Sequence, residues 1–256
     1  ELVKLTIILA LVKYFYLHQL GRNARLRDLF PPFLIVMVPF LFILKQPDLG
    51  TGLILLILFL SIVFFVGLDW KSLLIAAAGG VVLAPIGWHL LKEYQKGRIL
   101  TFFNPERDPL GSGYHIIQSM IAVGSGGLFG KGFLKGSQTQ LKFLPEQQTD
   151  FVFSVFAEEW GFIGGLVLMT MFLLLILWGL KIVIHSKDYM GALVAFGITS
   201  LIFWEVFINI GMVLGILPVV GIPLPFLSYG GSAMVVLMTA VGLLMNISVR
   251  RFILQS

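Results

Sequence analysis

The sequence contains no cysteine in 256 residues, so disulfides, thiol nucleophiles and zinc–thiolate sites are excluded. Histidine is also rare, with four residues at His18, His89, His115 and His185. No two of them are four positions apart, which excludes the helical histidine pair of a metalloprotease. Candidate site residues must therefore be sought among the carboxylates and the basic side chains.

Charged residues are scarce as well, at 12% of the chain, whereas 58% of the residues are hydrophobic and the mean hydropathy is +0.97. About a quarter of the residues of a soluble domain are usually charged, so this composition is typical of a chain solvated by lipid. The net charge of +5 does not indicate a nucleic-acid partner, because the basic residues form short clusters between apolar runs. Clusters of that kind report membrane topology.

The chain opens at Glu1 without a methionine, and it lacks the cleavage pattern of a signal peptide. We therefore expect further residues to precede it.

Seven apolar segments are candidates for membrane crossing, which takes roughly 20 residues of helix. The fifth is longer than one crossing and should tilt or protrude, and the second contains Pro39 and should be kinked. The segments are 2–17, 33–44, 51–68, 72–91, 151–184, 190–217 and 232–249.

Basic residues follow the first, third, fifth and seventh segments and predict the orientation of the chain. They are Arg22, Arg25, Arg27, Lys71, Lys187, Arg250 and Arg251. All of them lie on one side if the seven helices alternate, so that side is expected to be cytoplasmic. Residues 94–150 and 218–231 are then expected to be extracytoplasmic.

Three parts follow from this pattern: helices in 1–93, a long loop in 94–150, and helices in 151–256. The loop is far longer than a connector needs to be, which favours a functional segment. Within it, 116–123 is apolar but too short to span, which predicts an interfacial or re-entrant helix. The prolines of 218–225 exclude a continuous helix there, so that stretch lines a cavity or forms an ordinary turn.

The stretch 124–132 is rich in glycine, but it matches neither of the two glycine-rich phosphate-binding patterns tested. A Walker A loop would need Gly at Ser125, and a dinucleotide fingerprint would need Gly at Phe129. Backbone amides beside Lys131 could still approach an anion, and a turn near the membrane is an equal alternative.

Carboxylates at or inside apolar segments are candidates for chemistry, because charge at membrane depth is costly. Asp150 stands where the loop enters the fifth segment, so spacing alone favours a helix N-cap over a catalytic base. Glu158 and Glu205 could serve equally well in buried ion pairs, and Asn209 follows Glu205 by four positions.

Three stretches resemble the SEDS family (shape, elongation, division and sporulation proteins), and GIPLPFLSYGGSAM favours its elongation branch. They are 102–132 (FFNPERDPLGSGYHIIQSMIAVGSGGLFGKG), 143–161 (FLPEQQTDFVFSVFAEEWG) and 209–234. Shorter matches are QPDLGT at 46–51 and ELVK at 1–4. The stretches occur in the right order and cover most of residues 94–234, which makes the resemblance specific.

The resemblance implies an all-α polytopic protein of the bacterial cell (inner) membrane, of which this chain is the last seven of ten helices. It implies an enzyme that polymerises lipid II into peptidoglycan, working with a class B penicillin-binding protein. The family's essential external aspartate falls on Asp150, and motif positions near the central cavity fall on Lys4, Asp48, Arg98 and Gln118. At Lys142 division-type relatives tend to carry an acidic residue, so no carboxylate role carries over there.

Under this resemblance, Asp150 is expected to remove or position the acceptor hydroxyl proton during an inverting displacement of undecaprenyl diphosphate. Arg98 and Lys131 would stabilise charge on the diphosphate, and a divalent cation held by Asp150 or Asp48 could share that task. A flippase for the same lipid-linked precursor is the main alternative, because broken helices and internal charges suit transport. A third hypothesis is that the protein is a non-catalytic membrane scaffold.

Overall fold

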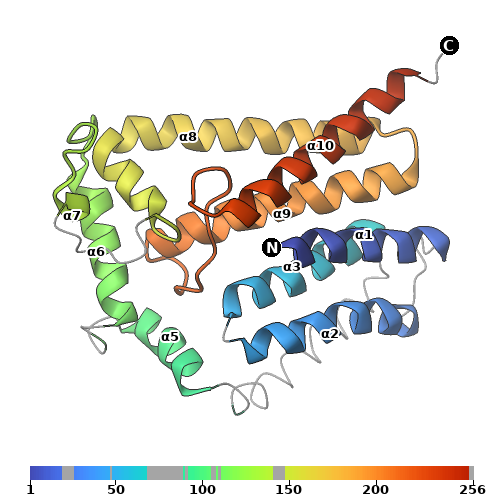
Figure 1. Ribbon diagram of the computed structural model, residues 1–256, viewed down its shortest axis with the longest axis horizontal. Coiled ribbons are helices and arrows are strands. Elements are labelled where there is room, and N and C mark those ends of the chain that lie inside the picture. Colours follow the sequence, from blue (N-terminus) through green and yellow to red (C-terminus); the bar gives the residue numbers. More distant parts are fainter. Residues whose placement is uncertain are drawn as a thin grey trace. The chain divides into compact units, whose positions relative to one another are not determined.

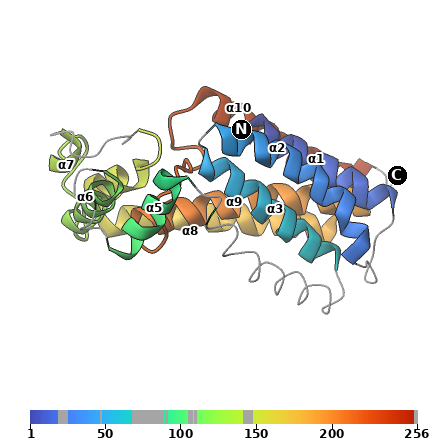
Figure 2. The ribbon, with the colours of Figure 1, turned by 90° about the horizontal axis from the view of Figure 1, so that it is seen from below.

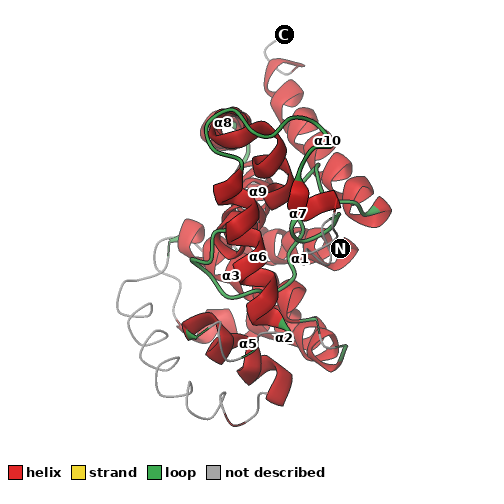
Figure 3. Cartoon of the chain, turned by 90° about the vertical axis from the view of Figure 1, so that its left-hand side faces the viewer, coloured by secondary structure: helices red, strands yellow, loops and turns green. Residues whose placement is uncertain are grey.

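A computed structural model describes residues 1–18, 26–46, 48–67, 89, 92–104, 108, 111–140 and 148–253. Throughout these ranges the regular structure is helical (Figure 3). The elements are α1 (Leu2–Leu17), the short 3₁₀ helix η1 (Leu26–Leu29), α2 (Phe30–Lys45), α3 (Leu49–Val66), α5 (Glu93–Phe103), α6 (Ser112–Ser125), α7 (Ser137–Gln140), α8 (Val152–His185), α9 (Tyr189–Val213) and α10 (Gly231–Ile253).

The chain divides into two compact units, and α8, α9 and α10 each contribute to both. Unit 1 holds 1–91, 177–202 and 235–256, and unit 2 holds 92–176 and 203–234. The long loop predicted at 94–150 therefore belongs to unit 2, where it forms α5, α6 and α7. The apolar stretch 116–123 is helical, as expected, and lies within α6.

Unit 1 is built on α1, α2 and α3, which pack against one another (Figure 2). Apolar side chains of α1, α3 and α9 form its core, among them Ile8, Leu55 and Ile198, all fully buried. The rings of Phe65 and Phe196 stack with centroids 4.2 Å apart, which joins α3 to α9. Between helices in lipid, such a core is stabilised by van der Waals contacts at high packing density.

Within the described residues, four helices are long and apolar enough to cross a membrane: α3, α8, α9 and α10. The helix α2 is apolar but shorter. Large apolar side chains stand exposed along α8, such as Leu166, Met171 and Leu174, as expected where lipid is the solvent. The protein is therefore a multi-pass, all-helical membrane protein. The predicted helix at 72–91 lies outside the described residues apart from position 89.

The prediction that the sixth segment runs to residue 217 was wrong, because α9 ends at Val213. Gly215 adopts φ +70°, and the N–H groups of Gly215 and Ile216 turn back to the carbonyls of Met212 and Gly211, at 3.2 and 2.8 Å. This pair of bonds is a Schellman ending, for which glycine in the left-handed region is favoured. Residues 214–230 are consequently free of helix, as the prolines had led us to expect for most of them.

The fifth segment is not one long tilted helix either. Gly161, with φ +67° and ψ −166°, breaks α8, and Figure 1 shows the ribbon bend in its yellow part. The part that follows, Phe162–His185, spans about 36 Å, which suits a single crossing. Hydropathy did not reveal the break because the residues on both sides of it are apolar.

Hydrogen bonds from the glycine-rich stretch 126–132 close this break. Lys131 N and Gly132 N donate to the carbonyls of Glu158 and Glu159, both at 3.0 Å. In return, Phe162 N and Ile163 N donate to Gly127 O at 2.8 Å and Leu128 O at 3.1 Å. Two carbonyls and two N–H groups beside the break are thus satisfied by the loop, as expected for backbone groups away from water.

The exchange requires glycine at the points of closest approach. A Cβ at Gly130 would stand 2.1 Å from Glu159 O, and one at Gly161 would stand 2.2 Å from Gly130 N. Both glycines also have positive φ, at +78° and +67°. The run of glycines therefore serves contact between the loop and α8.

We predict that Gly161→Ala lowers the free energy of unfolding by about 3 kcal/mol, because the backbone conformation is close to glycine-only and the new methyl meets backbone atoms. Thermal unfolding of the detergent-solubilised protein measures the effect. Gly124→Ala is the control: it lies in α6, and no atom stands within 4 Å of its Cβ position. Equal melting temperatures for the two variants would contradict the prediction.

Candidate functional site

Asp150 lies in unit 2, in the turn that leads into α8, and its side chain is half-buried. The helix begins at Val152, so Phe151 occupies the position that directly precedes it. The N-cap role of Asp150 stays a prediction, since helix starts are defined to within one or two residues. The ring of Phe151 stacks on that of His115 from α6, with centroids 6.0 Å apart, which anchors the turn from one side.

Asn209 of α9 anchors the same turn from another side. Its side-chain nitrogen donates to Asp150 O at 2.8 Å and to Ile222 O at 2.7 Å, so one amide links the turn to the segment 214–230. Asn209 is fully buried, and its Oδ1 has no hydrogen-bond partner among the described residues. This orientation of the amide is the one that presents donors to both carbonyls.

Ser228 supplies a second link between the two segments. Its hydroxyl donates to Thr149 O at 2.6 Å and accepts from Leu224 N at 2.7 Å, while Tyr229 N donates to Gln148 O at 2.7 Å. Three consecutive backbone carbonyls, those of residues 148–150, are thereby held by α9 and by the segment that follows it. Asp150 is fixed by its backbone on both sides.

The carboxylate of Asp150 and the guanidinium of Arg98 both lie beside the non-helical segment 214–230, at residues two positions apart. A Cβ built at Gly221 would lie 3.2 Å from Asp150 Oδ2, and Arg98 Nη1 donates to Val219 O at a long 3.5 Å. Gly221 adopts φ +74°, which favours glycine and keeps the space beside the carboxylate open. The structure thus brings two predicted site residues to the stretch 219–221.

Lys131 lies elsewhere in unit 2, in an ion pair with Glu158 of α8 at 2.8 Å. The same oxygen, Glu158 Oε1, also accepts from Ser137 Oγ at 3.2 Å and Gln138 N at 3.1 Å. The Glu158 side chain is fully buried, whereas that of Lys131 is 30% exposed. This cluster holds the loop 131–138 against α8.

The backbone amides beside Lys131 are also occupied. Those of Gly126 and Gly127 donate to carbonyls at the end of α6, that of Gly130 donates to Gly126 O, and those of Lys131 and Gly132 donate to α8. These amides are therefore used for folding and are not presented to an anion. Two interpretations of the stretch 124–132 were open, an anion-binding site and a turn. These hydrogen bonds favour the turn.

The other predicted site residues are placed as follows. In unit 1, Lys4 is buried and its Nζ lies 2.8 Å from both carboxylate oxygens of Glu1. Asp48, also in unit 1, is exposed and caps α3 by accepting from Thr51 N at 3.0 Å. Gln118 of unit 2 is half-buried on α6. Lys142 lies outside the described residues.

Sequence reasoning did not assign Asn209, Ser228 or Gly221 to the site. The sequence shows Asn209 as a polar residue in an apolar helix, four positions after Glu205. Spacing alone does not identify its hydrogen-bond partners. Ser228 and Gly221 sit in a proline-rich break whose path is set by contacts far along the chain.

Comparison with known proteins identifies the family to which the chain belongs. Residues 1–252 match the sequence model of a family described as cell cycle protein, which takes in FtsW, RodA and SpoVE. The chain belongs to this family. Its resemblance to SEDS proteins is thereby confirmed.

Individual relatives agree with that placement. The peptidoglycan glycosyltransferase MrdB of Escherichia coli strain K12 is 47% identical over 238 residues, covering 90% of this chain and 64% of MrdB. One chain of a solved peptidoglycan synthase complex aligns with a TM-score of 0.78 at 35% identity, covering 99% of this chain and 69% of that one. The Thermus thermophilus rod shape determining protein RodA aligns with a TM-score of 0.63 at 29% identity, covering 97% and 64%.

We predict that removing Lys131 and removing Glu158 lower the free energy of unfolding by different amounts. Lys131→Met leaves a fully buried carboxylate without its cation and should lower the free energy of unfolding by about 3 kcal/mol. Glu158→Gln leaves a partly exposed ammonium that water can reach, and should cost about 1 kcal/mol. Chemical or thermal unfolding of both variants in detergent gives the comparison.

The double variant provides the internal control, because with both charges removed the loss should be smaller than that of Lys131→Met alone. A larger loss for Glu158→Gln than for Lys131→Met would show that burial of the carboxylate does not govern this cluster.

Proposed function

We propose that the protein is a peptidoglycan glycosyltransferase that polymerises lipid II into glycan strands during cell elongation. The proposal rests on family membership, on the activity named for MrdB, and on the way Asp150 is held. The chain spans 64% of the length of MrdB, so the activity is proposed for the protein to which these residues belong.

The fixed backbone around Asp150 is the observation that carries the proposal. Asn209 and Ser228 hold the carbonyls of Asp150 and Thr149, so the backbone that carries the carboxylate is fixed, and its Oδ2 lies beside Gly221. A carboxylate held in this way can remove or orient the proton of the 4-hydroxyl of N-acetylglucosamine on the acceptor. The hydroxyl oxygen then attacks the anomeric carbon of the donor glycan, the bond to undecaprenyl diphosphate breaks, and the configuration inverts.

Arg98 and Lys131 are the proposed ligands of the diphosphate leaving group. Arg98 forms no ion pair among the described residues, so its charge is available. Lys131 Nζ donates to Glu158 and Ser137, which leaves one of its three N–H groups for a phosphate oxygen. We also keep Lys4, Asp48 and Gln118 as substrate-binding residues.

A divalent cation is a further part of the proposal. The described residues contain no cluster of three His, Asp or Glu side chains that could hold a metal. A Mg²⁺ ion would therefore be held by one carboxylate, of Asp150 or Asp48, with diphosphate oxygens and water, an arrangement common for this ion. Bound there, the cation would neutralise charge on the leaving group.

The proposed location is the bacterial cell (inner) membrane, with Asp150 on the extracytoplasmic side where lipid II is consumed. The proposed partner is a class B penicillin-binding protein that crosslinks the product. The similarity to a chain of a peptidoglycan synthase complex supports an assembly of this kind.

Asp150→Asn should abolish polymerisation of lipid II, by at least about a hundredfold, while leaving the protein folded, since the change removes only the ability to accept a proton. Gel analysis of the glycan made from labelled lipid II by purified protein measures it. Glu93→Gln is the matched control, because Glu93 belongs to the same unit and its side chain is 91% exposed. Near-normal polymerisation by Asp150→Asn would remove Asp150 from the mechanism.

A flippase for the lipid-linked precursor is the second candidate, favoured by the break of α8 at Gly161. The same assay separates the two, because an enzyme makes polymer in detergent, where a flippase has no membrane to transport across. A scaffold would make no polymer either, and cells carrying Asp150→Ala would keep growing.

Asn209 is proposed as a positioning residue for Asp150. Asn209→Leu should lower the polymerisation rate per folded molecule by about ten- to hundredfold, because a small displacement of a reacting group has effects of that size. Thr199→Val is the control on the same helix: its buried hydroxyl bonds only to Ala195 O of α9, at 2.7 Å, in the described structure. If both variants lose activity in proportion to their melting temperatures, Asn209 has only a structural role.

A further inference from the structure

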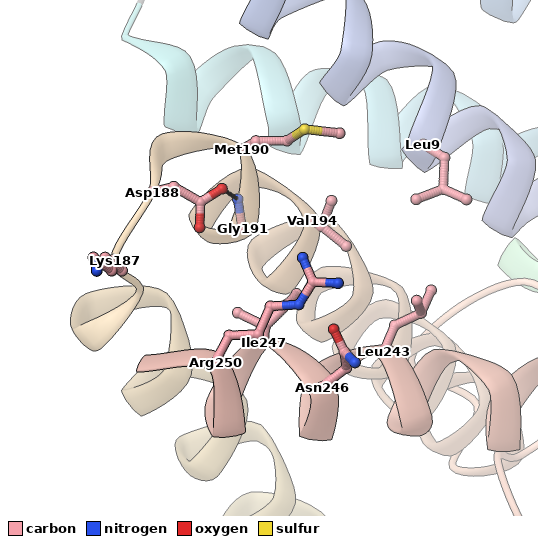
Figure 4. A pocket seen from close by; sticks show the side chains of 10 residues that line it. All are labelled: Leu9, Lys187, Asp188, Met190, Gly191, Val194, Leu243, Asn246, Ile247 and Arg250. Carbon is pink, nitrogen blue, oxygen red and sulfur yellow. Dashed lines mark hydrogen bonds between the residues drawn. The ribbon is translucent and has the colours of Figure 1, made fainter. Parts of the chain in front are cut away.

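Unit 1 contains a cavity of about 620 Å³ that the proposed polymerase reaction does not use. It is a partly open cavity lined by residues of α1, α9 and α10 and of the turn between α8 and α9 (Figure 4). The turn holds Lys187, and α10 contributes Arg250 and Asn246, which are four positions apart and share a face. Basic side chains thus gather at one end of three apolar helices.

The charges of this cavity do not cancel among the described residues. Within the described part of the chain, Lys187 and Arg250 take part in no ion pair, and the Asn246 amide makes no side-chain hydrogen bond. Asp188 also lines the cavity, but its carboxylate accepts from Gly191 N at 3.1 Å at the start of α9. The lining therefore carries two cations against one carboxylate that already has a partner.

The remaining walls are apolar. Leu9 of α1, Val194 of α9 and Leu243 of α10 line the cavity toward the middle of the helices. Figure 4 shows the Arg250 side chain directed toward α9, at the level of Val194. A ligand that fits this lining has an anionic, hydrogen-bonding head and an apolar tail, joined in the direction of the helix axes.

We propose that this cavity binds an anionic phospholipid, with the phosphodiester between Lys187 and Arg250, the glycerol region at Asn246, and an acyl chain along Leu9 and Val194. Basic pockets between transmembrane helices on the cytoplasmic side are suited to anionic headgroups. Lys187 and Arg250 are among the residues whose distribution predicts that side for this end of the helices. The apolar wall favours a lipid over a soluble anion, because a free phosphate would leave it unfilled.

The test titrates the full-length protein in neutral detergent with short-chain phosphatidylglycerol and follows the rise in melting temperature. We expect phosphatidylglycerol to bind at least about fivefold more tightly than phosphatidylcholine of the same chain length, and more tightly than glycerol phosphate. Lys187→Gln and Arg250→Gln should each weaken phosphatidylglycerol binding by about fivefold. Lys181→Gln should not, because Lys181 is exposed on α8 and does not line the cavity.

Equal binding of the two lipids to the unaltered protein would overturn the proposal, and this comparison needs no variant to fold. Unchanged phosphatidylglycerol binding by both Lys187→Gln and Arg250→Gln would overturn it as well. Glycerol phosphate binding as tightly as the lipid would assign the site to a soluble phosphate instead. None of these outcomes bears on Asp150, since lipid II is absent from the titration.

Discussion

The exchange of backbone hydrogen bonds at Gly161 is the interaction on which unit 2 depends. A break in an apolar helix exposes N–H and C=O groups that neither lipid nor side chains of leucine and phenylalanine can satisfy. Here the loop 126–132 supplies both kinds of partner, and so the loop and the helix must fold together. The same contact sets Glu158 under the loop, where Lys131 and Ser137 reach its carboxylate.

In the second break, at residues 214–230, backbone polar groups also need hydrogen-bond partners, and here side chains supply some of them. The Schellman ending at Gly215 satisfies the last carbonyls of α9, and Asn209 and Ser228 take up carbonyls of the turn at 148–150. A polar side chain buried in an apolar helix is costly unless it is hydrogen-bonded, and Asn209 offsets that cost by joining two segments that lack regular structure. Asp150 owes its fixed position to this arrangement.

Much of the helical framework could be predicted from hydropathy alone: α1 at 2–17 and α3 at 49–66 fall almost where the apolar segments do. The breaks could not. Gly161 stands between Trp160 and Phe162, so its surroundings look like uninterrupted helix, and Gly215, whose turn ends α9, lies three positions before the first proline, Pro218. Spacing likewise placed Asp150 at a helix start but could not show Asn209 beside it, because their contact joins residues 59 positions apart. Family resemblance, rather than spacing, singled out the aspartate.

The basic residues of the long loop show how structure narrows a prediction made from charge. Their number favoured an anionic ligand, but a cation that already has a buried or adjacent carboxylate contributes less to a ligand than one that does not. Lys131 is compensated by Glu158 at 2.8 Å, and Lys96 by Glu93 at 3.1 Å. Arg98, in contrast, reaches only a backbone carbonyl at 3.5 Å within the described residues, and that carbonyl lies two residues from Gly221, beside Asp150. Of these three cations, Arg98 therefore combines an uncompensated charge with proximity to the aspartate, which makes it the first choice for the diphosphate.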